Sequence, residues 1–223
     1  MPVEQLIVGW NRGGLGYVHQ LLEKADFDVG LTFGPDTTAK DVEEKYATSS
    51  RYEVSPYIVP FLDHPLLKNV KVTFILRDPM RVLNSLYFHG LFHGERDSAV
   101  QRAAFAHLPG LYASLRGMPA QAGCEYLLRW LEMSKKKSRY RNAIRIEEGP
   151  QSLLRHITGT SVKAPFILPT VNGSNCKQTI VPSVLPSRSR ENITKLLVKL
   201  GYREWAWFPR GGHAHYVNAD WHC

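Results

Sequence analysis

Cysteine is scarce in this chain of 223 residues, and the three cysteines lie far apart in sequence. They are Cys124, Cys176 and Cys223. An odd, scattered set does not make the paired framework of a small secreted domain, so we expect free thiols in a reducing compartment. No long apolar run precedes the first predicted strand at residues 5–8, so we expect neither a signal peptide nor a membrane anchor. These absences predict a cytoplasmic protein.

The residues that hold magnesium in a P-loop are also missing. Gly9 and Gly14 have the spacing of the Walker pattern, but Leu15 and Gly16 stand where that pattern needs Lys and then Ser or Thr. The glycines do not fit the G-x-G-x-x-G dinucleotide fingerprint either. The sequence therefore disfavours an ATP- or GTP-hydrolysing P-loop and a dinucleotide site. A P-loop-type nucleotide or phosphate kinase remains an alternative function.

Acidic residues are fewer than basic ones, 20 against 28, which gives a net charge of +8. Such a charge suits a polyanionic ligand, and a non-catalytic nucleic-acid or polyanion binder is the second alternative. The densest basic run, residues 135–141, is typical of a solvated helix end, and no nucleic-acid motif accompanies it, so we expect no nucleic-acid partner. The C-terminal tail contains a group of metal-binding residue types: His213, His215, Asp220, His222 and Cys223. Their spacing matches no tetrahedral template, so no metal is expected.

Two strand-to-helix junctions carry the strongest signal. Residues 5–8 form a predicted strand, followed by a glycine-rich loop at residues 9–16 and a helix at residues 17–24. Glycines let the backbone approach a phosphate, and a helix N-terminus offers free N–H groups. This junction predicts a phosphate cradle.

The second junction begins with residues 70–76, which read as an interior strand of a parallel sheet. Arg77 follows it, Pro79 starts a helix, and Ser85 lies about two turns into that helix. Ligands of an open α/β sheet bind outside the carboxyl ends of the strands, so Arg77 would point into the binding crevice. The structural alternative is an Arg77–Asp78 ion pair that caps an ordinary helix.

Together these segments resemble the sulfotransferases that use 3′-phosphoadenosine 5′-phosphosulfate (PAPS). Residues 9–17 are similar to the family's first loop, and Arg77 and Ser85 match in type and spacing the pair that grips the 3′-phosphate. Residues 52–57 (YEVSPY) are similar to the E-K-S-P-x-Y segment of one branch. Trp130 and residues 145–148 are similar to two further landmarks. The resemblance covers about residues 5–160.

The resemblance implies a donor site and a catalytic base. Glu53 would be the base, Arg12 would meet the charge on the leaving group, and His64 is the alternative base. Lys177 is the nearest candidate for a loop that closes over the 3′-phosphate. The first-loop residues implied to contact the donor are Arg12, Gly13, Gly14, Leu15, Gly16 and Tyr17. Because Leu15 and Gly16 replace two hydroxyl residues, phosphate contacts there would come from backbone N–H groups and Arg12.

The implied fold is an α/β three-layer domain with a central parallel sheet, one domain over residues 1–223, in which residues 160–223 form a less regular lid and tail. The implied reaction moves a sulfuryl group from PAPS, as co-substrate, to a hydroxyl or amine of a small-molecule or saccharide acceptor. Hydrophobic periodicity predicts further helices and strands. Helices are expected at residues 38–46, 79–91, 98–107, 120–137, 150–157 and 188–200, and strands at 27–31 and 143–146.

Overall fold

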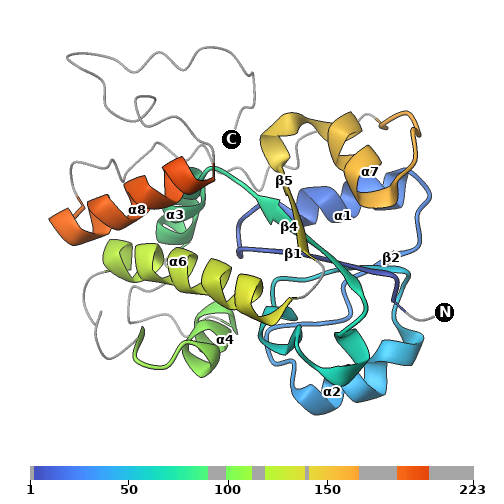
Figure 1. Cartoon of the computed structure of the whole chain (residues 1–223), viewed down its shortest axis with the longest axis horizontal. Coiled ribbons are helices and arrows are strands. Elements are labelled where there is room, and N and C mark those ends of the chain that lie inside the picture. Colours follow the sequence, from blue (N-terminus) through green and yellow to red (C-terminus); the bar gives the residue numbers. More distant parts are fainter. Residues whose placement is uncertain (1–2, 90–98, 112–118, 139–140, 166–184, 201–223) are drawn as a thin grey trace.

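A computed structural model describes residues 3–89, 99–111, 119–138, 141–165 and 185–200. Its centre is a sheet of five parallel strands in the order β2-β3-β1-β4-β5 (Figure 1). The strands are β1 (Gln5–Gly9), β2 (Val29–Gly30), β3 (Tyr52–Val54), β4 (Lys71–Leu76) and β5 (Arg141–Arg145). Because β1 lies in the middle and β4 beside it, the two junctions singled out in the sequence are neighbours at the carboxyl edge of the sheet.

Helices cover both faces of this sheet. They are α1 (Leu15–Lys24), α2 (Ala39–Lys45), α3 (Pro79–Phe88), α4 (Ala99–His107), α6 (Pro119–Lys137), α7 (Pro150–Thr158) and α8 (Ser187–Lys199). Short 3₁₀ turns are formed at η1 (Tyr46–Thr48), η2 (Val59–Phe61), η3 (Pro65–Leu67) and η4 (Ile146–Glu148). Helices α1 and α7 lie together on one face, and α3, α6 and α8 pack on one another on the other face (Figure 1).

The alternation of side chains along β1 and β4 divides the core into these two layers. Ile7 and Ile75 pack under α1 and α7, whereas Leu6, Val8 and Phe74 pack under α3 and α6. Both faces of the central strands are buried, which explains their almost uninterrupted apolar sequence. The predicted α/β three-layer fold with a central parallel sheet is confirmed.

The predicted elements agree with the observed ones within a few residues, and one difference concerns a candidate site residue. The sequence predicts that Glu53 follows a strand and lies at the edge of the binding crevice, but this residue lies inside β3. Helix α1 also begins at Leu15, two residues earlier than expected. Most of the predicted lid and tail lies outside the described residues, so the domain boundaries stay a prediction.

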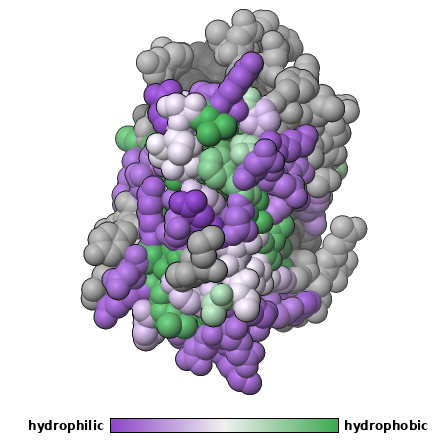
Figure 2. Space-filling view, turned by 90° about the vertical axis from the view of Figure 1, so that its right-hand side faces the viewer, coloured by the Kyte–Doolittle hydropathy of each residue, from purple (hydrophilic) through white to green (hydrophobic). Residues whose placement is uncertain are grey.

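The surface is mixed in character. On the face drawn in Figure 2, hydrophilic residues predominate and hydrophobic ones form small separate patches. None of the helices in the described part of the chain combines the length and apolar character that a bilayer-spanning helix needs.

Candidate functional site

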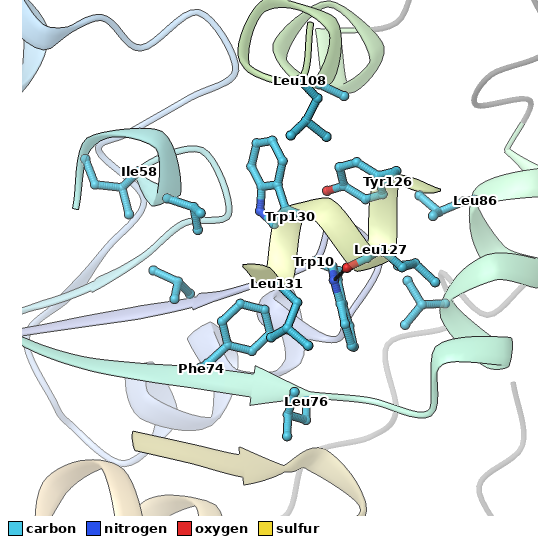
Figure 3. Packing of buried hydrophobic residues seen from close by; sticks show 14 of the residues in the cluster. Trp10, Ile58, Phe74, Leu76, Leu86, Leu108, Tyr126, Leu127, Trp130 and Leu131 are labelled. Carbon is cyan, nitrogen blue, oxygen red and sulfur yellow. Dashed lines mark hydrogen bonds between the residues drawn. The ribbon is translucent and has the colours of Figure 1, made fainter. Parts of the chain in front are cut away.

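The glycine-rich loop between β1 and α1 is anchored in the core by Trp10. This side chain is fully buried, and its indole Nε1 donates a hydrogen bond of 2.9 Å to the carbonyl oxygen of Leu127 on α6 (Figure 3). Its ring meets that of Phe74 on β4 edge to face, with centroids 5.6 Å apart. The loop is therefore held between the sheet and α6.

The next residue adds a polar anchor to the same helix. The backbone N–H and side-chain amide of Asn11 both donate to the hydroxyl oxygen of Tyr126, at 3.2 and 3.0 Å. Burial raises the pKa of Tyr126 far above its ordinary value, so this hydroxyl stays neutral. Sequence reasoning missed both anchors. A Trp-Asn pair in a glycine-rich turn was the available signal, because a large aromatic there has to be buried somewhere.

The backbone of the loop depends on its glycines. A Cβ at Gly13 would lie 2.8 Å from the carbonyl oxygen of Trp10, closer than real Cβ atoms come. Gly14 precedes α1 with a φ of 93°, and Ile146 packs over the place where its side chain would be. Arg12 has a φ of 66°, which is uncommon for a residue with a side chain. Such outliers occur where surrounding structure fixes a functional side chain.

Arg12, Arg77 and Ser85, which the sequence placed in one site, are joined by hydrogen bonds. The guanidinium Nε of Arg12 donates to Ser85 Oγ at 3.1 Å. Arg77 Nη1 donates to the carbonyl oxygen of Arg12, also at 3.1 Å. Arg12 Nη2 also contacts His89 Nε2. We call these four connected residues, Arg12, Arg77, Ser85 and His89, the cation cluster. All four are partly or largely exposed to solvent.

His89 was not among the predicted site residues. It caps the C-terminus of α3 and lies four residues after Ser85, so both project from one face of the helix. That i, i+4 spacing was the signal in the sequence. Burial, and secondly the charge of Arg12, lower the pKa of His89.

Helix α3 is placed by Asp78, which follows Arg77 at the end of β4. The Asp78 carboxylate accepts hydrogen bonds from the N–H groups of Met80 and Arg81, at 2.9 and 3.5 Å, and Pro79 takes the first helical position. Its own N–H donates to Glu147 Oε1 at 3.0 Å. Burial raises the pKa of Asp78 to about 6. Asp78 therefore caps α3, while Arg77 reaches across to the loop.

Glu53 lies apart from the cation cluster. It pairs with Leu6 in the sheet, three residues before the end of β1, or about 10 Å from that edge. The side chain is fully buried. Its carboxylate accepts three hydrogen bonds, from Thr32 N at 3.0 Å, Thr32 Oγ1 at 2.6 Å and Ser50 N at 2.9 Å. This arrangement ties the β2 edge of the sheet to the loop before β3.

His64, the alternative base, lies at the other edge of the sheet. It precedes η3, in the connection that leads into the amino end of β4, whereas Arg77 follows the carboxyl end. Its Nδ1 accepts a hydrogen bond of 3.4 Å from the N–H of Leu66, and its Nε2 lies 3.6 Å from a carboxylate oxygen of Glu43. His64 thus acts as a cap in this position.

The remaining predicted donor ligands belong to α1 or to undescribed parts of the chain. Leu15 is buried beneath the loop, while Gly16 is exposed and has open space around it. Tyr17 is half-buried, and burial raises its pKa. Lys177 lies outside the described residues, as does the histidine-containing tail. In the part of the chain that is described, no three His, Cys, Asp or Glu side chains come together as metal ligands would.

The cation cluster can bind an anion. Two guanidinium groups, which donate in a fixed fork, and a serine hydroxyl are the groups that hold phosphates and sulfates in proteins. The loop that carries Arg12 leads directly into α1, whose N-terminal N–H groups and dipole favour negative charge. The glycine loop allows the backbone to approach such a ligand closely.

No family model matches the sequence, and no curated protein sequence matches it. Among solved structures, the chain is similar to the crystal structure of a sulfotransferase from Alicyclobacillus acidocaldarius, with a TM-score of 0.51 and 14% identity. The match covers 93% of this chain and 99% of that one. An identity this low carries information about the fold alone. The chain has a sulfotransferase-like α/β fold.

Proposed function

We propose that this protein transfers a sulfuryl group from PAPS to a hydroxyl or amine of a small-molecule or saccharide acceptor. The observation that carries the proposal is the joining of Arg12, Arg77 and Ser85 at the carboxyl edge of β1 and β4. These residues come from two segments more than sixty positions apart, and the sequence resemblance assigned them to one ligand. A sulfotransferase-like fold agrees with that assignment.

Each group has a role in this reaction. Arg77 and Ser85 would hold the 3′-phosphate, and the loop N–H groups with Arg12 would hold the phosphosulfate. The acceptor attacks sulfur in line, so the new S–O or S–N bond forms as the bond from sulfur to the phosphate oxygen breaks. Negative charge then grows on the leaving adenosine 3′,5′-bisphosphate, where a fixed guanidinium is most effective. The acceptor's proton passes to a base.

Glu53 as that base stays a prediction, and its environment supports a structural role instead. A fully buried carboxylate that already accepts three hydrogen bonds is not accessible to an acceptor hydroxyl from solvent. His64 also lies away from the cation cluster, because it precedes η3 in the connection to the amino end of β4. The proposal therefore depends on the donor site and not on either base.

Binding of adenosine 3′,5′-bisphosphate, the product of the donor, tests the proposal directly. We expect this ligand to raise the melting temperature of the protein, because a ligand that binds only the folded state stabilises it. ATP with Mg²⁺ and a short oligonucleotide serve as parallel ligands. A response to ATP with Mg²⁺ alone would favour the kinase, and a response to the oligonucleotide alone would favour the polyanion binder.

A transfer assay then defines the reaction. Donor labelled in the sulfuryl group is incubated with phenols, amines and saccharides, and label should move to at least one class only when the protein is present. Arg12→Ala should lower this turnover by about 10²-fold, more than it weakens donor binding, because its interaction strengthens as charge develops. Equal losses of binding and turnover would remove Arg12 from the leaving-group role.

A further inference from the structure

His89 occupies a position in the cation cluster that the proposed donor contacts do not use. Its backbone N–H donates to the carbonyl oxygen of Ser85 at 3.1 Å, which fixes it at the end of α3. Its ring meets Phe88 edge to face and places Nε2 against Arg12 Nη2. His89 is exposed to solvent as a residue. A ligand held by Arg12 and Ser85 would therefore lie next to this imidazole.

The contact between Arg12 and His89 defines the protonation state of the imidazole. A guanidinium only donates hydrogen bonds, so Nε2 has to accept, and the ring is neutral with its proton on Nδ1. A second proton would place two cations in contact. Partial burial and the Arg12 charge accordingly lower the pKa of His89 in the free protein.

We propose that His89 is a further ligand of the donor's phosphate groups and takes up a proton when the anion binds between it and Arg12. This inference rests on the proposed function. A phosphate dianion between the two side chains reverses the electrostatics, because each cation now faces an opposite charge. Protonated Nε2 then donates to a phosphate oxygen, and the site gains a third cationic ligand.

The charged groups around His89 determine how the pH dependence of ligand affinity is interpreted. Arg12 on the loop contacts it, and Arg77 reaches the same loop through the Arg12 carbonyl. Arg81 lies about two turns earlier on α3. Asp78 titrates near pH 6 but sits at the opposite end of α3, about 15 Å along the helix. An Asp78→Asn variant separates its contribution from that of His89.

The sign of the effect follows from linkage. The pKa of His89 is below its ordinary value in the free protein and is raised in the complex, so binding is favoured by protons. Affinity for adenosine 3′,5′-bisphosphate should rise as pH falls from about 8 to about 5.5, by about tenfold for each unit by which binding raises the pKa. The ligand's own phosphates protonate near pH 6 and act in the opposite direction, so a matched variant is required.

The experiment measures bisphosphate affinity by calorimetry in wild type, His89→Asn and a matched control, His107→Asn. His107, on α4 beside Phe61, also has a lowered pKa but lies outside the cation cluster. We expect wild type and His107→Asn to gain affinity relative to His89→Asn by about tenfold between pH 8 and pH 5.5. Asp78→Asn should keep that gain. An affinity difference that is the same at every pH would mean that His89 only supports the structure, and would overturn the proposal.

Calorimetry in buffers with different ionisation enthalpies gives a second readout, the number of protons taken up on binding, which is compared between wild type and His89→Asn. At about pH 7 the ligand's phosphates are mostly ionised, so wild type should take up a fraction of a proton on binding. Equal proton uptake by wild type and His89→Asn would overturn the role of His89 and leave the proposed function standing. Absence of bisphosphate binding at every pH would instead contradict the sulfotransferase proposal itself.

Discussion

The cation cluster and Glu53 are two places where ionisable side chains are held by hydrogen bonds to neutral groups, and they differ in their access to solvent. Arg12 is held by a serine hydroxyl and an imidazole at the carboxyl edge of the sheet, where it is partly open to solvent. Glu53 is held by Thr32 and Ser50 at a fully buried position within β3. A soluble anion can reach the first place but not the second.

This difference in access indicates that Glu53 stabilises the fold, whereas the cation cluster is available to bind a ligand. Hydrogen bonds to Glu53 are complete without a ligand, and they connect the β2 edge strand to the rest of the sheet. An accessible guanidinium on a left-handed backbone adds nothing comparable to the core. We therefore expect mutations at Glu53 to change stability and mutations in the cation cluster to change ligand binding.

Removal of the buried carboxylate should have the largest effect. Glu53→Ala would leave the N–H groups of Thr32 and Ser50 without their acceptor. It would also open a cavity beside Gly30, because the Glu53 carboxylate fills the space where a Cβ of that residue would lie. Each unsatisfied buried donor costs about 1–3 kcal/mol, so the loss in unfolding free energy should be about 3 kcal/mol or more. Urea denaturation followed by circular dichroism measures it.

A matched control is Glu4→Ala, which removes a carboxylate that forms an exposed ion pair with Arg51. Such pairs contribute about 0–1 kcal/mol, so this variant should remain close to wild type. Glu53→Gln adds the catalytic comparison. If it keeps its stability and bisphosphate affinity while turnover falls by about 10²-fold or more, then Glu53 is the base after all.

The next effect in size concerns Arg77. Arg77→Ala removes a charged donor at the carboxyl end of β4 and should weaken binding of adenosine 3′,5′-bisphosphate by about 2–4 kcal/mol, with little change in unfolding free energy. Lys68→Ala removes the same charge from an exposed position before the amino end of β4 and should leave the affinity nearly unchanged. Equal losses in the two variants would mean that only net charge attracts the ligand.

A smaller effect is expected at Asp78, a partly buried carboxyl group at the carboxyl edge of the sheet. Its pKa is raised to about 6, so the folded state keeps a proton that the unfolded state has lost between about pH 4 and 6. Stability should therefore fall as pH rises through that window and stay level above it. Asp78→Asn keeps the helix cap, removes this slope, and should be about 1–2 kcal/mol more stable than wild type at pH 7 after allowance for partial exposure. Denaturation across the pH range measures the slope, and an unchanged slope would contradict the assignment.

Most of the fold was predictable from local pattern. The central strands are buried on both faces and so carry almost only apolar residues, and Asp78-Pro79 marks the start of α3 by its capping chemistry. The joining of Arg12 to Ser85 was also foreseeable, because parallel strands bring their carboxyl ends to one edge. These features depend on residues close in sequence or on a general rule of topology.

Other features depend on contacts between side chains that are far apart in the sequence, and local sequence patterns do not predict such contacts. Trp10 is anchored by Leu127, 117 residues away, and Asn11 by Tyr126. Glu53 has the same residue type whether it lies in a crevice or in the middle of a strand, so resemblance to a motif could not decide its environment. The spacing of Ser85 and His89 is visible in the sequence, but the contact of His89 also depends on the Arg12 side chain turning toward α3, from a residue with a left-handed backbone.

The finest test of the comparison is Ser85→Ala, because it removes one neutral partner of Arg12 and leaves both cations. The hydroxyl accepts from Arg12 Nε at 3.1 Å in the free protein and would donate to a phosphate in the complex. Binding exchanges one charge-assisted hydrogen bond of this hydroxyl for another, so the net contribution should be about 0.5–1.5 kcal/mol; bisphosphate affinity should fall by that amount while unfolding free energy changes by less. Ser161→Ala, at an exposed position after α7, is the control for loss of a hydroxyl.

If Ser85→Ala destabilised the fold as much as it weakened binding, then the cation cluster would hold α3 against the loop, and the contrast with Glu53 would fail. Because Arg12 still meets His89 in this variant, we expect the guanidinium to stay in place and the loss to appear in binding.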